Sequence, residues 1–153
     1  MSKSQDRICY YLATVFGLGK SPLAPGTVGS LFALLLIWLW FPRHPGLQLI
    51  WAMGASIIGI LVCQRVAEIV GKKDPSEVII DEVAGMFLAF LWLPSMPLWV
   101  LGVGFVLFRF FDITKPFLVG KAEKLPGSAG IMLDDLVAGA FTNLILHILM
   151  RVF

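Results

Sequence analysis

The stretch GIMLDDLVAGAFTNLILHILM, Gly130 to Met150, places two adjacent carboxylates directly before a long apolar run. An ionised carboxylate leaves water only at a high free-energy cost, so Asp134 and Asp135 need partners if this run is buried. The two acids therefore cap a helix, bind a cation, or do both. The residues that follow them are apolar enough to predict a helix in an apolar surrounding.

The composition of the chain indicates what that surrounding is. Of its 153 residues, 58% are hydrophobic and 14% are charged, whereas a soluble domain carries about 25% charged residues. The mean hydropathy of +0.88 predicts a membrane protein, with residues 1–153 forming one domain. The chain has no basic block with interleaved aromatic residues. We therefore expect the lipid bilayer and no nucleic acid as a partner, and leave open whether the chain forms a homo-oligomer.

Five apolar runs separated by short polar breaks predict an all-α fold, a small multi-pass bundle of about five membrane helices. The runs are Thr27–Phe41, Leu47–Cys63, Val78–Leu93, Pro97–Phe111 and Asp135–Val152. Because a helix needs about 20 residues to cross the hydrocarbon core, several runs are short, and four spans are the alternative. The N-terminal segment lacks a signal-peptide cleavage pattern and is expected to be retained.

The charged residues gather on one side of this predicted bundle. If the breaks at 41–47 and 94–97 share one side with the C-terminus, all ten acids and ten of the twelve basic residues lie on the other. Lys and Arg mark the cytoplasmic side of membrane proteins. We therefore predict that the N-terminus and residues 64–82 and 112–135 are cytoplasmic, and that the C-terminus is on the opposite side.

A short internal similarity links two of the runs. DEVAG at Asp81–Gly85 resembles DLVAG at Asp135–Gly139, and in each an acid opens an apolar run that then holds an Ala-Gly pair. Small residues let membrane helices approach closely. If the two helices pack side by side, their acids meet; a chance similarity is the alternative.

Five acids are the candidate metal ligands of the chain. Helix capping accounts for one carboxylate at a helix start, but each additional anion there repels the first. A divalent cation removes that repulsion, and hard carboxylate oxygens favour Mg²⁺ or Mn²⁺ over zinc. The candidates are Asp81, Glu82, Asp112, Asp134 and Asp135.

Two further segments carry groups that suit a phosphate. In FRFFDITKP, Phe108–Pro116, Arg109, Asp112 and Lys115 recur every three residues and are expected on one helical face. The two bases suit an anionic substrate, and an ordinary charged helix end is the alternative. The glycine-rich GLGKSPLAPGTVGS, Gly17–Ser30, is either a flexible loop or a phosphate cradle at a helix N-terminus. Phosphate and metal chemistry at a membrane face predicts a phospholipid head group as the substrate.

The motifs GLGKSPLAPGTVGS, IIDEVAGMF, FRFFDITKP and GIMLDDLVAG resemble, in this order, those of the phosphatidylglycerophosphatase A family. The resemblance implies a helical enzyme of the bacterial inner membrane, with its active site facing the cytoplasm. It also implies Mg²⁺-dependent hydrolysis of phosphatidylglycerophosphate to phosphatidylglycerol and phosphate. The catalytic groups it implies are Asp81, Glu82, Asp112, Lys115, Asp134 and Asp135, and the phosphate-binding groups are Ser21, Thr27, Arg109 and Lys115.

Two mechanisms and two classes of function stay open. Either a metal-bound water or an aspartate is the nucleophile, and the sequence does not separate them. A small ion or lipid transporter that uses the acids as a cation site is the alternative function. A transporter is expected to hold its acids at mid-membrane depth. Here they cluster toward one face, which favours the enzyme.

Overall fold

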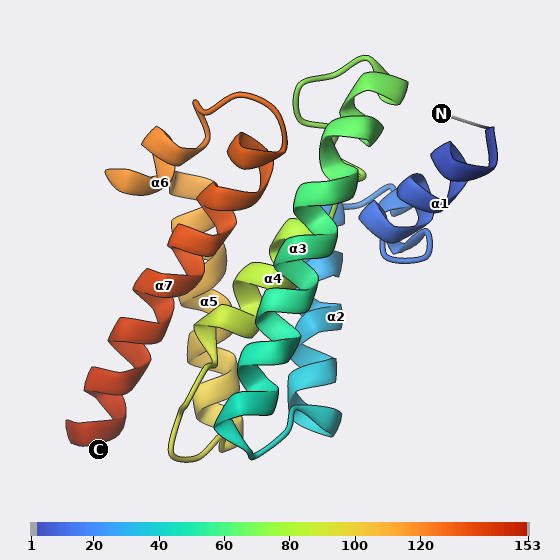
Figure 1. Cartoon of the computed structure of the whole chain (residues 1–153). Coiled ribbons are helices and arrows are strands. Elements are labelled where there is room, and N and C mark those ends of the chain that lie inside the picture. The colour runs from blue at the N-terminus through green and yellow to red at the C-terminus, as the bar shows by residue number, and fades with distance from the viewer. Residues whose placement is uncertain (1–2, 153) are drawn as a thin grey trace.

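The structure is a computed structural model that describes residues 3–152, and it consists of helices arranged around one short central helix (Figure 1). In chain order, these are α1 (Lys3–Ala13), the 3₁₀ helix η1 (Leu18–Lys20), α2 (Pro25–Trp40), α3 (Pro45–Val70), α4 (Ile80–Ala89), α5 (Leu98–Thr114), α6 (Leu118–Ala122) and α7 (Ser128–Val152). Within residues 3–152 there is no strand, so the predicted all-α class is confirmed.

The chain passes along the bundle five times, and the passes correspond to the five apolar runs. The connections at 41–44 and 90–97 and the end of α7 lie at one end of the bundle, which we call the far end (Figure 1). The connections at 71–79 and 115–127 lie at the opposite end, called the charged end. Among the described helices, α3 and α7 are long and apolar enough to cross a membrane, and α2 is a shorter apolar helix.

The short helix α4 is the buried centre of the bundle. Eight of its ten residues are buried, and it packs against α7, α3 and α2. Those surrounding helices expose large apolar side chains on their outer surface, including Trp38, Leu61 and Leu144. An apolar exterior of this extent suits lipid better than water.

Two glycines allow α4 and α7 to cross closely. A Cβ atom added to Gly85 would stand 2.6 Å from the carbonyl oxygen of Asp135, and one added to Gly139 would overlap the carbonyl oxygen of Gly85. Neither position has room for a side chain, so the two backbones touch there. The DEVAG and DLVAG segments thus pack side by side, which the sequence similarity left as a condition, and this packing brings Asp81, Glu82 and Asp135 together.

The last helix begins earlier than the sequence analysis predicts. Gly127 has a left-handed conformation (φ 63°), and α7 starts at Ser128 rather than at Asp135. The apolar pattern locates only the part of a helix that meets an apolar surrounding, and the first turns of α7 are mixed in polarity. Asp134 and Asp135 therefore lie in the second turn. Backbone N–H groups there already have helical partners, so capping does not explain these two acids.

Two polar side chains, buried Gln48 and half-buried Asn143, close the far end of the bundle. The side-chain nitrogen of Asn143 donates to the carbonyl oxygens of Ala89 (3.1 Å) and Leu91 (2.9 Å), where α4 ends. The side chain of Gln48 accepts from the N–H of Trp92 (2.8 Å) and donates to a backbone carbonyl (2.9 Å). Unpaired backbone groups are costly in an apolar surrounding, so these two side chains let α4 end within the bundle.

Candidate active site

Three carboxylates from α4 and α7 meet toward the charged end. Oxygen atoms of Asp81, Glu82 and Asp135 all lie within 4.8 Å of one another. Asp81 and Asp135 are buried, with 7% and 3% of their surface exposed. Ionised carboxylates this close repel one another, and burial strengthens the repulsion. A bound cation relieves this repulsion. Asp81, Glu82 and Asp135 are called the facing carboxylates below.

The other two predicted acids pair with bases in the same region. Nζ of Lys115 lies 2.6 Å from Oδ2 of Asp134 and 3.0 Å from Oε1 of Glu123. Nη1 of Arg109 pairs with Oδ2 of Asp112. The five predicted acids therefore divide into three that face one another and two that each hold a base.

Lys115 reaches Asp134 because it has left the helix. α5 ends at Thr114, and Lys115 follows in a left-handed conformation (φ 44°, ψ 52°). Burial lowers the pKa of Lys115, but hydrogen bonds to its two carboxylate partners outweigh burial and hold the pKa above its ordinary value. The predicted single helical face for Arg109, Asp112 and Lys115 is therefore wrong, although all three residues line one pocket.

Two buried polar atoms of this region lack a hydrogen-bond partner among the described residues. They are Oε2 of Glu82 and Nε of Arg109. Leaving such an atom unpaired costs about 1–3 kcal/mol, and native proteins keep few of them without a ligand or a water. One atom accepts and the other donates, so the region suits a ligand set that holds both a cation and an anion.

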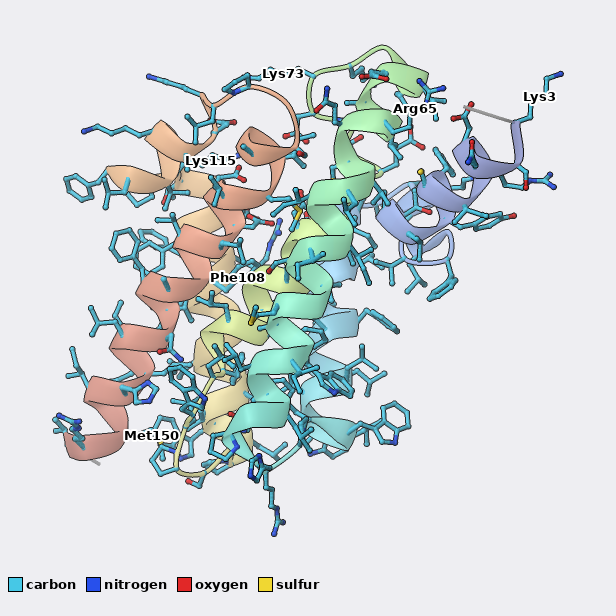
Figure 2. All side chains as sticks on the ribbon, in the orientation of Figure 1. Lys3, Arg65, Lys73, Phe108, Lys115 and Met150 are labelled. Atoms are coloured by element: carbon cyan, nitrogen blue, oxygen red, sulfur yellow. The ribbon has the colours of Figure 1, made fainter. Side chains whose placement is uncertain are left out.

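These groups line one open pocket of about 350 Å³. Its walls come from the start of α2 (24–26), the loop before α4 (74–78) and the end of α5 (109–115), together with the acids of α4 and α7. Figure 2 shows Lys115 toward the charged end of the bundle and Met150 at the far end. The pocket therefore opens where the predicted polar groups gather.

Gly26, in the first turn of α2, lies directly against the acids. A Cβ atom there would overlap Oε1 of Glu82 and stand 3.0 Å from Nη1 of Arg109. Ser30, one turn later, donates to the carbonyl oxygen of Gly26 (2.8 Å) and lies 3.5 Å from the same Arg109 nitrogen. A side chain at this position would have to displace the Glu82 carboxylate and the Arg109 guanidinium.

Two residues predicted to bind phosphate are not part of the pocket lining, although Thr27 directly follows the lining residue Gly26. Among the residues that the structure describes, Ser21 and Thr27 do not belong to its lining. Oγ of Ser21 instead donates to the carbonyl oxygen of Leu23 (3.1 Å). Asp74 in the lining and Glu123 beside Lys115 could not be predicted, because a single acid in a loop forms no motif.

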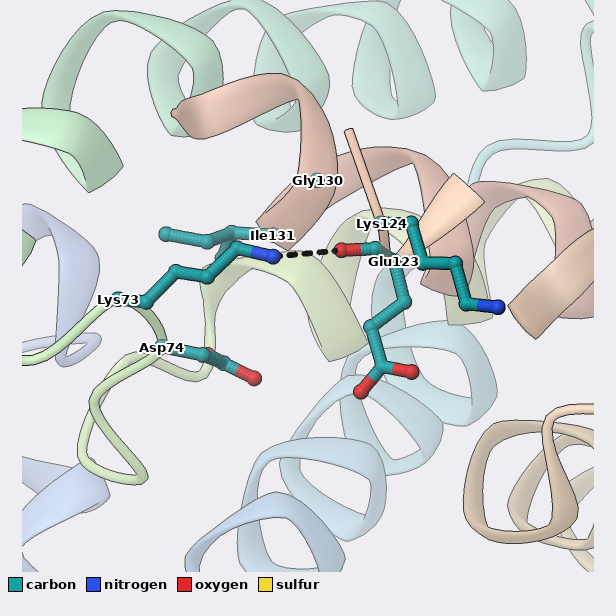
Figure 3. Close-up of a pocket in the computed structure, with 6 residues that line it drawn as sticks. All are labelled: Lys73, Asp74, Glu123, Lys124, Gly130 and Ile131. Carbon is teal, nitrogen blue, oxygen red and sulfur yellow. Dashed lines mark hydrogen bonds between the residues drawn. The ribbon is translucent and has the colours of Figure 1, made fainter. Parts of the chain in front are cut away.

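A smaller pocket adjoins the first (Figure 3). It has a volume of about 210 Å³ and is lined by Lys73, Asp74, Glu123, Lys124, Gly130 and Ile131. Nζ of Lys73 donates to the carbonyl oxygen of Glu123 (3.3 Å). Asp74 lines both pockets, and Glu123 is joined to Lys115. The ion pair of Lys115 with Glu123 therefore links the two pockets.

Known proteins resemble the chain over most of its length. The family model described as Phosphatidylglycerophosphatase A matches residues 11–150. A Bacteroides thetaiotaomicron protein, provisionally named a phosphatidylinositol-3-phosphatase, is 35% identical over 90% of this chain and 90% of its own. The proteins named phosphatidylglycerophosphatase A in Escherichia coli and Haemophilus influenzae are 34% and 35% identical, over 90% and 89% of this chain and 81% and 85% of their own. No solved structure matches the chain.

Proposed function

Because the chain belongs to the phosphatidylglycerophosphatase A family, we propose that it hydrolyses phosphatidylglycerophosphate to phosphatidylglycerol and inorganic phosphate. The observation that carries this proposal is the set of facing carboxylates, Asp81, Glu82 and Asp135, in a pocket that also holds Arg109 and Lys115. Metal-assisted hydrolysis of a phosphomonoester uses acids that hold a metal ion beside bases that hold the phosphate. The chain is accordingly an enzyme of phospholipid metabolism.

Mg²⁺ is the cofactor that fits the facing carboxylates. Asp81, Glu82 and Asp135 offer hard oxygen ligands, and within residues 3–152 no hydrogen-bond donor occupies Oε2 of Glu82 and competes with a cation. Asp112 and Asp134, each held by a base, complete the acidic surroundings. When bound, such an ion neutralises charge on phosphate oxygens and makes water more acidic.

Arg109 and Lys115 are the groups that we assign to the substrate phosphate. Asp112 holds the Nη1 corner of the Arg109 guanidinium, which leaves the buried Nε to donate to a phosphate oxygen. Asp134 and Glu123 hold the Lys115 ammonium group in the same pocket. A pocket carboxylate takes a proton of the attacking water as the water oxygen forms a bond to phosphorus. The bond from phosphorus to the glycerol oxygen breaks, and the carboxylate returns the proton to that oxygen, which leaves as the alcohol.

In this proposal the site lies at the cytoplasmic surface of the bacterial inner membrane. The neighbouring helix α3 indicates how deep the site lies in the membrane. Sγ of Cys63 lies 3.8 Å from Sδ of Met132, which precedes Asp134 by two residues. The polar side chains of Gln64 and Arg65 follow Cys63 directly in α3. The acids therefore lie near the level at which the apolar part of the bundle ends.

We infer that the five passes all enter the bilayer. At 1.5 Å per residue, the 16 residues of α2 and the 17 of α5 extend about 24 Å and 26 Å, near the ~30 Å of the hydrocarbon core. The shorter α4 is shielded by its neighbours, and Asn143 and Gln48 satisfy its end. Ten of the twelve basic residues belong to the charged end, which the positive-inside rule assigns to the cytoplasm. Reporter fusions that place the C-terminus in the cytoplasm would contradict this topology.

Phosphate release from lipid vesicles tests the function. Purified protein is mixed with vesicles that contain phosphatidylglycerophosphate, phosphatidylinositol 3-phosphate or phosphatidic acid, each with Mg²⁺ or with EDTA. We expect release from phosphatidylglycerophosphate with Mg²⁺ and almost none with EDTA. Phosphatidylinositol 3-phosphate is the second candidate because one relative is named for it. A faster reaction on that lipid would show that the enzyme is a phosphatase with a different lipid substrate. Release of phosphate from none of the three lipids would favour the transporter.

A further inference from the structure

The lining segments of the 350 Å³ pocket differ in polarity at their outer edge. The loop before α4 contributes Asp74, Pro75 and Ser76, of which Asp74 and Ser76 are exposed and polar. The other two segments are the start of α2 and the end of α5. Both of these helices are predominantly apolar along their length. The pocket thus has a polar edge toward the loop and two edges that continue into apolar helices.

Large apolar side chains are exposed on the two helical edges. Ile113 lines the pocket and is nevertheless 68% exposed, and Leu23, which directly precedes the lining residue Ala24, is 79% exposed. Phe117, two residues after the lining residue Lys115, is 87% exposed. The outer surface of the whole bundle is apolar, but these side chains stand beside a charged pocket. They are therefore placed to meet a molecule that is charged at one end and apolar at the other.

We propose that the lipid substrate reaches the pocket sideways from the membrane, between the start of α2 and the end of α5, with its apolar part against Leu23 and Ile113. This inference rests on the proposed function and adds the location of the diacylglycerol part of the substrate. Arg109 and Lys115 attract the phosphate, and Ile113 lies between them in the sequence on the same pocket edge. One segment therefore contacts both ends of the lipid.

The free energy of lipid transfer favours this route. Each methylene group that leaves the membrane for water loses hydrophobic stabilisation, so a lipid with two long chains is costly to lift out of the bilayer. If the pocket lies at the level of the membrane surface and opens toward the bilayer, only the head group has to move, and the acyl chains stay in the membrane. The polar edge at Asp74 and Ser76 then faces water and suits the release of inorganic phosphate.

The test compares two substrates that share a head group. Ile113→Ser and Leu23→Ser are assayed on long-chain phosphatidylglycerophosphate in vesicles and on a short-chain form dissolved in water. We expect the ratio of kcat/KM for long-chain to short-chain substrate to fall about tenfold, because the lost apolar contact serves only the long chains. The matched control is Ile69→Ser, an isoleucine of α3 at the charged end that is 44% exposed and outside this pocket. Its ratio should stay within about twofold of the wild type.

Each outcome of this test supports or overturns the proposal. An unchanged ratio in both variants overturns it, and so does an equal loss on both substrates, which indicates a structural effect of the substitutions. An equal fall in the ratio for Ile69→Ser would also overturn it, because any exposed apolar residue at this end would then act through membrane binding. If the wild-type protein hydrolyses neither substrate, the proposed function itself fails, which the wild-type assay alone reveals.

Discussion

The two ends of the bundle bury polar side chains in opposite ways. At the far end, Gln48 and Asn143 bond to backbone groups that the end of α4 would otherwise leave unpaired. At the charged end, Glu82 and Arg109 each keep a buried polar atom without a partner among the described residues. Within the described residues, the polar side chains of the far end therefore have protein partners, whereas two buried atoms of the charged end have none. Hydrogen-bond satisfaction thus separates polar residues that hold the fold from those that carry chemistry.

Asp135→Asn should give the largest effect and the clearest difference between the two ends. The substitution removes one of the facing carboxylates, so we expect activity on phosphatidylglycerophosphate to fall about a hundredfold to a thousandfold. Stability should not fall, because one of three mutually repelling charges is gone. Phosphate release and thermal unfolding, measured on the same preparation, check both parts. Near wild-type activity would contradict the assignment of Asp135 to the metal.

Lys115→Met should lower kcat/KM about a hundredfold, because the substitution removes a charge that faces the substrate phosphate. It also leaves the buried carboxylate of Asp134 without its partner, which lowers stability. The double variant Lys115→Met with Asp134→Asn should recover stability without recovering activity. Measurements of unfolding and of turnover separate the two effects.

The matched control for Lys115 is Lys121→Met, an exposed lysine of α6. Exposed lysines attract an anionic membrane only weakly once salt screens them, so we expect less than about a threefold loss. If both lysine variants lose activity equally, Lys115 belongs to a general basic surface and its contact with phosphate should be dropped.

Gly26→Ala should lower activity about tenfold, because its Cβ would displace the Glu82 carboxylate and the Arg109 guanidinium. Gly102→Ala in α5 is the control, since a Cβ atom there meets nothing within 4 Å. That change should leave activity unaltered and raise helix stability slightly. Equal turnover in the two alanine variants would show that the first turn of α2 does not position the site.

Asn143→Ala should have the smallest effect on turnover and a clear effect on stability. The carbonyl groups of Ala89 and Leu91 lose their donor, which we expect to cost about 1–3 kcal/mol. Activity per folded molecule should stay within about twofold of the wild type. Leu144→Ala, at an exposed neighbouring position, is the control for a general loss of side-chain volume. A hundredfold loss of turnover in Asn143→Ala would contradict the claim that polar residues of the far end hold the fold and do not take part in the chemistry.

The helices and the meeting of the acids could be predicted from the sequence because both follow from local patterns. The apolar runs located all five passes, and the repeated acid and Ala-Gly pattern suggested what would meet if α4 and α7 pack together, as they do. The cluster of Asp81, Glu82 and Asp135 follows directly from that packing. These features need only the periodicity and the charge of short segments.

The pairing within the site could not be predicted, because it depends on backbone turns and on contacts between distant segments. Lys115 binds Asp134 only because it adopts a left-handed conformation after α5. The approach of Gly26 to Glu82 joins segments more than 50 residues apart in the sequence. In the sequence, Asn143 is an ordinary polar residue in an apolar run. Its role depends on the end of α4, which lies beside it only in the folded structure.

The Mg²⁺ dependence of thermal stability tests the central claim most directly. A ligand that binds only the folded protein raises its stability, so saturating Mg²⁺ should raise the Tm of the wild type by several degrees. Asn143→Ala should show the same rise from a lower starting Tm, and Asp135→Asn should show almost none. A wild-type Tm that does not change with Mg²⁺ would contradict a metal site at the facing carboxylates. A rise in the Tm of Asp135→Asn equal to that of the wild type would contradict it as well.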